Sequence, residues 1–194
     1  MLHIVLEYSA VLFSLVAVWL TVKRVIWCWP ISILAVLLTA WVYLKAGLFA
    51  EMALQAYYLA AAIWGWVQWA SWKQSLHRIP IQAVSVKRLL PFIGLFALLG
   101  LLLGLLFDRY TLHDTPYFDS MLAAGSLLAT ALMVKRVIQN WLFWILIDSA
   151  SILLYLHKEL YGFALLFFIY TLLAYKGWRD WNIIFKTESS VSGS

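Results

Sequence analysis

The chain has 194 residues, of which 65% are hydrophobic and only 12% are charged. With a mean hydropathy of +0.89, this composition excludes a water-soluble domain and is typical of a protein that crosses a lipid bilayer several times. A net charge of +5 would favour a nucleic-acid partner in a soluble protein. Here the basic residues lie between apolar runs, so we expect no nucleic acid as a partner.

Seven apolar runs of about twenty residues predict seven membrane-spanning helices. These runs cover residues 4–22, 26–44, 48–70, 89–107, 118–134, 138–156 and 160–178. The connection 71–88 is long and basic, and 108–117 is the other long connection. The end of the chain is rich in small polar residues, and we expect residues 183–194 to form a disordered tail.

Lysine and arginine collect on one side of the predicted spans. Eleven of the fourteen lie on that side: Lys23, Arg24, Lys73, Arg78, Lys87, Arg88, Lys135, Arg136, Lys176, Arg179 and Lys186. The other side has Lys45, Arg109 and Lys158. Because cytoplasmic loops carry the excess of basic residues, the sequence predicts a multi-pass protein of the bacterial inner membrane whose N-terminus is outside and whose C-terminus is cytoplasmic.

The chain contains an internal repeat at a constant offset of 112 residues. The string Val22-Lys23-Arg24-Val25-Ile26 recurs as Val134-Lys135-Arg136-Val137-Ile138. Further matched pairs are Trp29 and Trp141, Leu48 and Leu160, Tyr58 and Tyr170, Gly65-Trp66 and Gly177-Trp178, and Trp69 and Trp181. Similar composition could align scattered leucines, but it does not align a basic string and three pairs of tryptophans in register.

The repeat defines the predicted domains. Residues 1–72 form one three-helix repeat, 73–116 a basic loop and a linker helix, and 117–182 the second repeat. Three spans plus one linker span return the second repeat in the same orientation as the first. The predicted fold class is therefore an all-α integral membrane protein with two parallel three-helix repeats. Parallel repeats are a transporter architecture with the substrate site near mid-membrane at the repeat interface.

The sixth predicted span carries a carboxylate near its middle, in the stretch Asn140-Trp141-Leu142-Phe143-Trp144-Ile145-Leu146-Ile147-Asp148. A charge there costs roughly 3 kcal/mol on insertion scales, and such residues are disproportionately functional. On a helix, Trp141, Trp144, Asp148 and Tyr155 share one face. We therefore predict a binding surface for a flat cationic solute; the competing interpretation is a hydrogen-bonded aspartic acid that packs on a neighbouring helix.

The tryptophans and ends of this span have competing interpretations. Trp141 and Trp144 could hold a cationic ring between their indoles, at roughly 0.5–2 kcal/mol each. Trp141 matches Trp29 across the repeat, which favours a structural role, whereas Trp144 matches Ser32 and breaks the symmetry. Asn140 is either a ligand or a helix-end hydrogen bonder, and Tyr155 either an outer gate or an interfacial residue. The tryptophans at helix ends, including Trp69 and Trp181, fit an interfacial belt.

A second polar group lies on the third predicted span. Glu51, Gln55 and Tyr58 are spaced i, i+4, i+7 and share a face. The amide of Gln55 offers the donor and acceptor that a carboxamide or pyrimidine edge requires, although interhelical hydrogen bonding would also explain it. Pro30, one turn into the second predicted span, is a candidate hinge for alternating access because proline frees a backbone carbonyl.

Other activities lack the residues they need. Cys28 is the single cysteine, the four histidines have no i,i+4 pair, and no phosphate-binding loop occurs, so the sequence predicts no metal site, no cofactor and no enzyme. A non-transporting assembly subunit would explain seven helices but not a polar stripe at mid-membrane. The sequence leaves the oligomeric state open, a homo-oligomer included.

Several of these motifs together resemble the Pnu family of bacterial vitamin transporters. They are Ile26-Trp27-Cys28-Trp29-Pro30, Gly47-Leu48-Phe49-Ala50-Glu51-Met52-Ala53-Leu54-Gln55, Gly65-Trp66-Val67-Gln68-Trp69 and Asn140-Trp141-x-x-Trp144. The resemblance covers about residues 10–182. Two positions depart from the family: Glu51 replaces its usual Asp, and some nicotinamide riboside members have Asn where Asp148 stands.

The resemblance implies a SWEET-like fold in which a linker helix joins the two repeats. It also implies uptake of an unphosphorylated vitamin by facilitated diffusion, followed by trapping by a cytoplasmic vitamin kinase. Nicotinamide riboside, a precursor of NAD, is the favoured substrate and thiamine the alternative. Both carry a permanently positive ring, so Asp148 serves either; the family's riboflavin branch moves a neutral, larger molecule.

Overall fold

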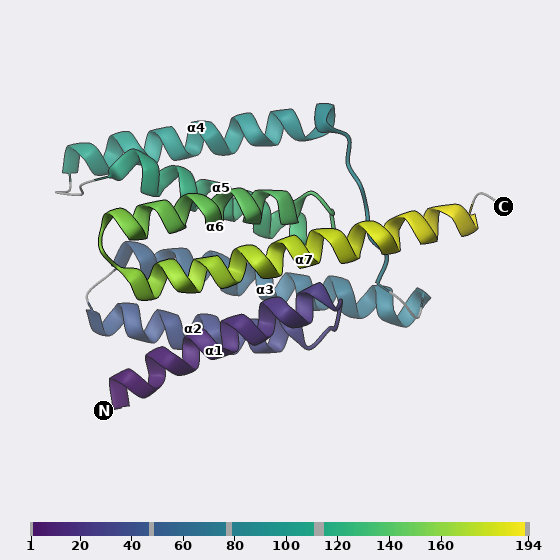
Figure 1. Ribbon diagram of the computed structural model, residues 1–194, viewed down its shortest axis with the longest axis horizontal. Coiled ribbons are helices and arrows are strands. Elements are labelled where there is room, and N and C mark those ends of the chain that lie inside the picture. The colour runs from purple at the N-terminus through teal and green to yellow at the C-terminus, as the bar shows by residue number, and fades with distance from the viewer. Residues whose placement is uncertain (1, 47–48, 77–78, 111–114, 193–194) are drawn as a thin grey trace. The chain divides into compact units, whose positions relative to one another are not determined.

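A computed structural model gives the fold of residues 2–46, 49–76, 79–110 and 115–192. These residues form seven α-helices, labelled in Figure 1: α1 (Leu2–Val22), α2 (Cys28–Ala46), α3 (Phe49–Leu76), α4 (Val86–Tyr110), α5 (Pro116–Val134), α6 (Asn140–His157) and α7 (Tyr161–Ser192). The chain divides into two compact units, one of residues 1–81 and 183–194 and the other of residues 82–182. The all-helical fold that the sequence predicts is confirmed.

Five helices (α1, α2, α4, α5 and α6) are long and apolar enough to cross a membrane, judged by length and composition over the described residues. The other two, α3 and α7, are longer, at 28 and 32 residues, and have charged residues toward their C-terminal ends. At a rise of 1.5 Å per residue, α7 is about 48 Å long, which exceeds the hydrocarbon core of about 30 Å. Its C-terminal part must therefore extend beyond the bilayer.

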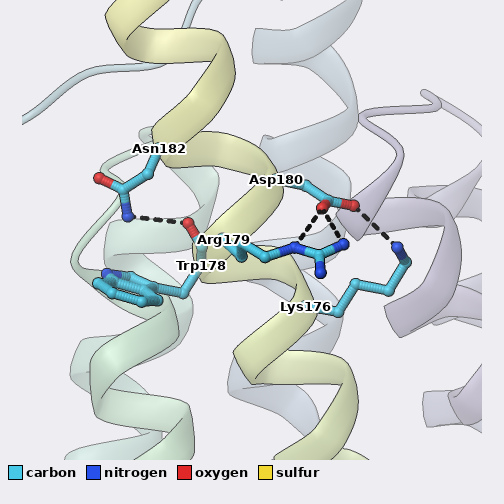
Figure 2. A network of polar contacts seen from close by, with 5 residues as sticks. All are labelled: Lys176, Trp178, Arg179, Asp180 and Asn182. Carbon is cyan, nitrogen blue, oxygen red and sulfur yellow. Dashed lines mark hydrogen bonds and ion pairs between the residues drawn. The ribbon is translucent and has the colours of Figure 1, made fainter.

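The charged residues of α7 begin at Lys176. Figure 2 shows Asp180 accepting ionic hydrogen bonds from both sides: Lys176 Nζ lies 3.1 Å away and Arg179 Nη2 lies 3.3 Å away. Partial burial acts to raise the pKa of Asp180, but the hydrogen bonds and positive charges of Lys176 and Arg179 outweigh it and hold that pKa below its usual value. This network marks the end of the apolar part of α7.

Of the tail predicted to be disordered, residues 183–192 are helical in the structure as the end of α7, and residues 193–194 lie outside the described residues. Glu188 on this extension contacts the turn after α1, with its Oε1 3.5 Å from Arg24 Nη1. Local composition suggested disorder, whereas a polar helix that extends past the bilayer can be held by such a contact. The division into domains predicted from the repeat stays a prediction.

The repeated basic string folds into the same turn in both units. Arg24 and Arg136 adopt left-handed backbone conformations, with φ of 57° and 58°. Each lies at the end of a helix: Arg24 N–H donates to Thr21 O at 2.9 Å, and Arg136 N–H donates to Met133 O at 2.9 Å. The next N–H also reaches back, from Val25 to Leu20 O at 3.0 Å and from Val137 to Leu132 O at 2.9 Å. This pair of bonds is the Schellman motif, which ends a helix sharply.

A tryptophan pair follows each turn. In the first unit Trp29 on α2 meets Trp69 on α3 at right angles, with ring centroids 5.2 Å apart. In the second unit Trp141 on α6 meets Trp181 on α7 in the same way at 5.3 Å and 89°. A glycine makes room for the first indole of each pair, because a Cβ on Gly65 would overlap Trp29, and one on Gly177 would lie 2.6 Å from Trp141 Cδ2. Two sequence repeats therefore fold into two matching structural units.

Helices α4 and α5 pack closely in the second unit through two glycines. A Cβ on Gly100 would lie 2.6 Å from Met121 Sδ, and one on Gly104 would lie 2.7 Å from Tyr117 Cδ1. Small residues let helix backbones approach, which is how helices associate without a hydrophobic driving force between them. The buried core of this unit continues through Leu89, Leu128, Leu132 and Val137.

Candidate substrate site

The predicted polar residues of the second repeat all lie on α6. The helix begins at Asn140, whose side-chain Nδ2 donates to Val137 O at 2.7 Å and so ties the first turn to the preceding loop. Asn140, Trp144 and Asp148 follow at intervals of four residues, so they climb one face of the helix. This face carries the candidate site.

Asp148 is buried near the middle of this apolar helix, with 4% of its surface exposed. Among the residues that the structure describes, no hydrogen bond or ion pair reaches its carboxylate. Buried charges in proteins are normally paired or bound to a ligand, since an unpaired one is expensive. Asp148 therefore has the environment expected of a group whose partner is a solute.

Unpaired polar atoms accompany Asp148 on α5 and α6. The indole N–H of Trp144, Oδ1 of Asn140 and the hydroxyl of Ser120 are buried without a hydrogen-bond partner among the described residues. Buried polar groups are satisfied in more than nine cases out of ten, so these atoms call for an explanation, as do the indole N–H groups of Trp29 and Trp141, which are buried without a partner in the same way. On α6 these groups offer two acceptors and an indole donor, whereas the Ser120 hydroxyl follows Asp119, which pairs with Lys158 at the opposite end of α6 from Asn140. That set suits a ligand with hydroxyl groups and a positive charge.

Trp141 and Tyr155 are engaged by neighbouring aromatic rings. Trp141 is 1% exposed, and its indole packs on Gly177 and Trp181. Tyr155 stacks on Phe163 and Phe167, with centroids 5.2 Å from each. These contacts explain both residues as packing groups, and their proposed contact with substrate stays a prediction.

The predicted residues of the first unit are Gln55, Tyr58, Glu51 and Pro30. Gln55 on α3 is buried, with 9% of its surface exposed, and Tyr58 is half-buried with its ring 5.7 Å from that of Tyr57. The side chain of Glu51 lies outside the described part of the structure. The functional roles assigned to these residues stay predictions.

Pro30 lies closer to its helix end than the sequence suggested. Because α2 begins at Cys28 and not at residue 26, Pro30 is the third residue of the helix. N–H groups in the first turn have no intrahelical acceptor, so proline breaks no helical bond there. Pro30 therefore leaves no helical hydrogen bond unmade at which α2 could bend, and the hinge stays a prediction.

Two details differ from the sequence-based expectation. The sequence predicts an interfacial position for Trp69 and Trp181, but both are 0% exposed and each packs against the other tryptophan of its pair. Ser120 was not singled out, because a serine near the start of an apolar helix resembles many others. Only its burial in the structure, at 2% exposure, reveals it. In the described ranges, no three His, Cys, Asp or Glu side chains gather as a metal site would require.

Seven long helices and buried polar groups inside an apolar helix define a polytopic membrane protein of the transporter type. The sequence profile of the nicotinamide mononucleotide transporter family matches residues 4–183, and the chain belongs to this family. It is thus a multi-pass protein of the bacterial inner membrane, and its homologues and fold are those of transporters and not of enzymes.

Named relatives extend this assignment. The nicotinamide riboside transporter PnuC of Escherichia coli (strain K12) is 24% identical over 165 residues, which is 72% of this chain and 69% of that protein. The riboflavin/roseoflavin transporter RibM of Streptomyces davaonensis is 24% identical over 179 residues, which is 91% of this chain and 84% of that protein. The crystal structure of the vitamin B3 transporter PnuC superposes with a TM-score of 0.74 at 19% identity, over 94% of this chain and 82% of that one.

Proposed function

We propose that this chain takes up nicotinamide riboside, a vitamin B3 form and NAD precursor, across the cytoplasmic membrane by facilitated diffusion. The observation that carries the proposal is the unpaired carboxylate of Asp148, buried at mid-membrane one turn from the unpaired indole N–H of Trp144. Membership of the nicotinamide mononucleotide transporter family and the likeness to a nicotinamide riboside transporter support the choice of substrate.

The chemistry of the riboside matches the groups available on α6. Its pyridinium ring carries a permanent positive charge, for which Asp148 supplies the counter-charge and Trp144 a cation–π face worth roughly 0.5–2 kcal/mol. Its ribose hydroxyls can pair with Asn140 Oδ1, which is buried without a partner among the described residues. In this proposal Gln55 binds the carboxamide, because an amide side chain can both donate to it and accept from it.

Thiamine is the alternative substrate, because its thiazolium ring is also a permanent cation that would pair with Asp148. Riboflavin is a further possibility raised by the relative RibM. It is neutral at its ring, so a buried carboxylate gives it no charge pairing. The presence of Asp148 therefore favours the two cations over the flavin.

The membrane potential supplies the driving force in this proposal. Eleven of the fourteen basic residues lie on one side of the predicted spans. Because cytoplasmic loops carry the excess of basic residues, this distribution supports an orientation with the N-terminus outside and the C-terminus cytoplasmic. A cation that crosses into a negative interior gains about 2.3 kcal/mol per 100 mV. Alternating access between the two repeats would pass the vitamin, and phosphorylation by a cytoplasmic kinase would retain it.

The test is equilibrium binding to the purified protein, measured by calorimetry with nicotinamide riboside, thiamine and riboflavin run in parallel. Preferential binding of the riboside, together with its uptake into liposomes that depends on membrane potential, would support the proposal. Preferential binding of thiamine would establish the alternative. Preference for riboflavin, or binding of none of the three, would refute the assignment of Asp148 as a counter-charge.

A further inference from the structure

The turns formed by the two copies of the basic string, at residues 22–26 and 134–138, differ in what covers them. In the second unit, residues 82–84 run alongside the turn: Gln82 N–H donates to Arg136 O at 3.0 Å, and Ile138 N–H donates to Gln82 O at 2.8 Å. The side chain of Gln139 continues the contact, with Nε2 2.7 Å from Val84 O and Oε1 3.3 Å from Val84 N. Residues 82–84 therefore occupy the backbone edge of this turn, where the main-chain N–H of Ile138 and the carbonyl of Arg136 are exposed for bonding.

In the first unit the same edge borders a cavity. The backbone N–H of Ile26, which corresponds to that of Ile138, has no partner among the described residues, and Trp27 stands in place of Gln139. A cavity of about 340 Å³ opens here, lined by Lys23, Arg24, Lys73, Val25, Trp27 and Ile79, as well as by Ile26 itself. Three cations and a free N–H thus surround a space that the other unit fills with its own backbone.

The charges around the cavity are poorly compensated. Lys23 and Lys73 are exposed and have no carboxylate within salt-bridge distance in the described parts of the chain. Arg24 donates from Nη1 to Ile79 O at 3.0 Å and pairs loosely with Glu188 at 3.5 Å. Among the described residues, Glu188 is the one carboxylate that pairs with any of these three cations, and the cavity therefore favours an anion.

The position of the cavity indicates where the anion comes from. Lys23 directly follows the apolar span of α1, and α2 begins at Cys28, so the turn lies at the level where the bilayer surface begins. The rim includes Trp27, which is 64% exposed and of a kind enriched at that interface. Basic pockets in this position suit lipid head groups.

We propose that this cavity binds the phosphate of an anionic phospholipid head group. The phosphate oxygens accept from the Ile26 N–H and from the two lysines, while the acyl chains lie along the apolar surface beside Trp27. The site uses none of the residues assigned to the vitamin. It therefore stands or falls independently of the proposed function.

The test is a titration of the purified protein in detergent with phosphatidylglycerol or phosphatidylcholine of identical acyl chains, with bound lipid counted by native mass spectrometry. The Lys23→Ala/Lys73→Ala variant should bind phosphatidylglycerol about 25-fold more weakly, from about fivefold per lysine. The matched control is Lys87→Ala/Lys135→Ala, which removes two exposed lysines of the second unit, one of them Lys135, the counterpart of Lys23 at the covered turn. This control should retain the affinity of the wild type.

Further measurements decide between sources of phosphate and guard against a misfolded variant. Glu188→Gln leaves every lining residue in place and should increase lipid binding, because it removes the competitor for Arg24. Equal loss of binding in the two lysine pairs, equal binding of the two lipids, or an unchanged affinity in Glu188→Gln would overturn the proposal. Displacement of the lipid by millimolar inorganic phosphate at constant ionic strength would overturn it in favour of a site for free phosphate.

Discussion

Replacement of Asp148 by asparagine tests the charge at the centre of the candidate site. The substitution keeps the shape of the side chain and removes its charge. At 4% exposure the carboxylate is poorly screened by water, and an opposite charge about 4 Å away is worth up to about 4 kcal/mol at an effective dielectric constant of about 20. Part of that gain is lost when the cation leaves water. We therefore expect Asp148→Asn to weaken binding of nicotinamide riboside about 100-fold, or about 2.7 kcal/mol.

Stability separates this effect from damage to the fold. A buried carboxylate without a partner opposes folding, so Asp148→Asn should raise the midpoint of thermal unfolding in the absence of ligand or leave it unchanged. Asp119 provides the matched control, because it is a carboxylate of the same unit that is satisfied by Thr115 at 3.0 Å and Lys158 at 3.6 Å. Asp119→Asn should change riboside affinity less than about twofold, as expected for a surface ion pair.

The assay is calorimetric titration of both variants with the riboside and with neutral riboflavin, followed by uptake into liposomes. Only the cationic ligand should lose affinity in Asp148→Asn. If the affinity for the riboside is unchanged, Asp148 does not contact the charge. If the variant unfolds at a lower temperature than the wild type, Asp148 instead holds the helices together through a hydrogen bond.

Two further predictions concern the repeated framework. Gly177→Ala would place a Cβ 2.6 Å from Trp141 Cδ2, and Gly65→Ala would place one against Trp29, so each should destabilise the protein by about 1–3 kcal/mol. The controls are Gly94→Ala and Gly162→Ala, where nothing lies within 4 Å of the added Cβ and no loss of stability is expected. Equal melting temperatures for all four variants would show that the two indoles do not need the space left by Gly65 and Gly177. Glu159 has a left-handed φ of 58° on an exposed turn, a conformation that glycine adopts without strain. Glu159→Gly should therefore raise the free energy of unfolding by about 1 kcal/mol, measured by thermal unfolding. A loss of stability would show that the glutamate side chain is needed.

The helices could be predicted from the sequence because hydrophobic runs of fixed length leave few alternatives in a bilayer. The two turns could be predicted as equivalent because five consecutive residues recur. The burial of Trp69 and Trp181 could not, since a tryptophan near a helix end fits an interfacial belt equally well. The glycines at Gly65 and Gly177 distinguish the two cases, because a glycine four residues before a tryptophan leaves room for a second indole from another helix.

The site was harder to predict than the fold because it consists of exceptions to the repeat. Asn140, Trp144 and Asp148 stand where the first repeat has Cys28, Ser32 and Val36, and Gln55 stands where the second has Phe167. The tryptophans and glycines that pack are therefore duplicated, whereas these four residues occur in one copy only. Asymmetry against a repeat is a signal that a single sequence contains. Ser120 does not give this signal, because its counterpart in the first repeat, Tyr8, is polar too.

The same asymmetry gives Gln55 a role that can be tested through the ligand. If its amide pairs with the carboxamide of the riboside, Gln55→Leu should weaken riboside binding at least about tenfold, because a hydrogen-bonding group of the ligand is then left unpaired in a buried site. An analogue whose carboxamide is replaced by a methyl group should bind the wild type weakly and bind Gln55→Leu no worse. Calorimetry with the two ligands and two proteins measures that coupling. Equal losses for both ligands would assign Gln55 to helix packing, as expected for a polar side chain that bonds to a neighbouring helix.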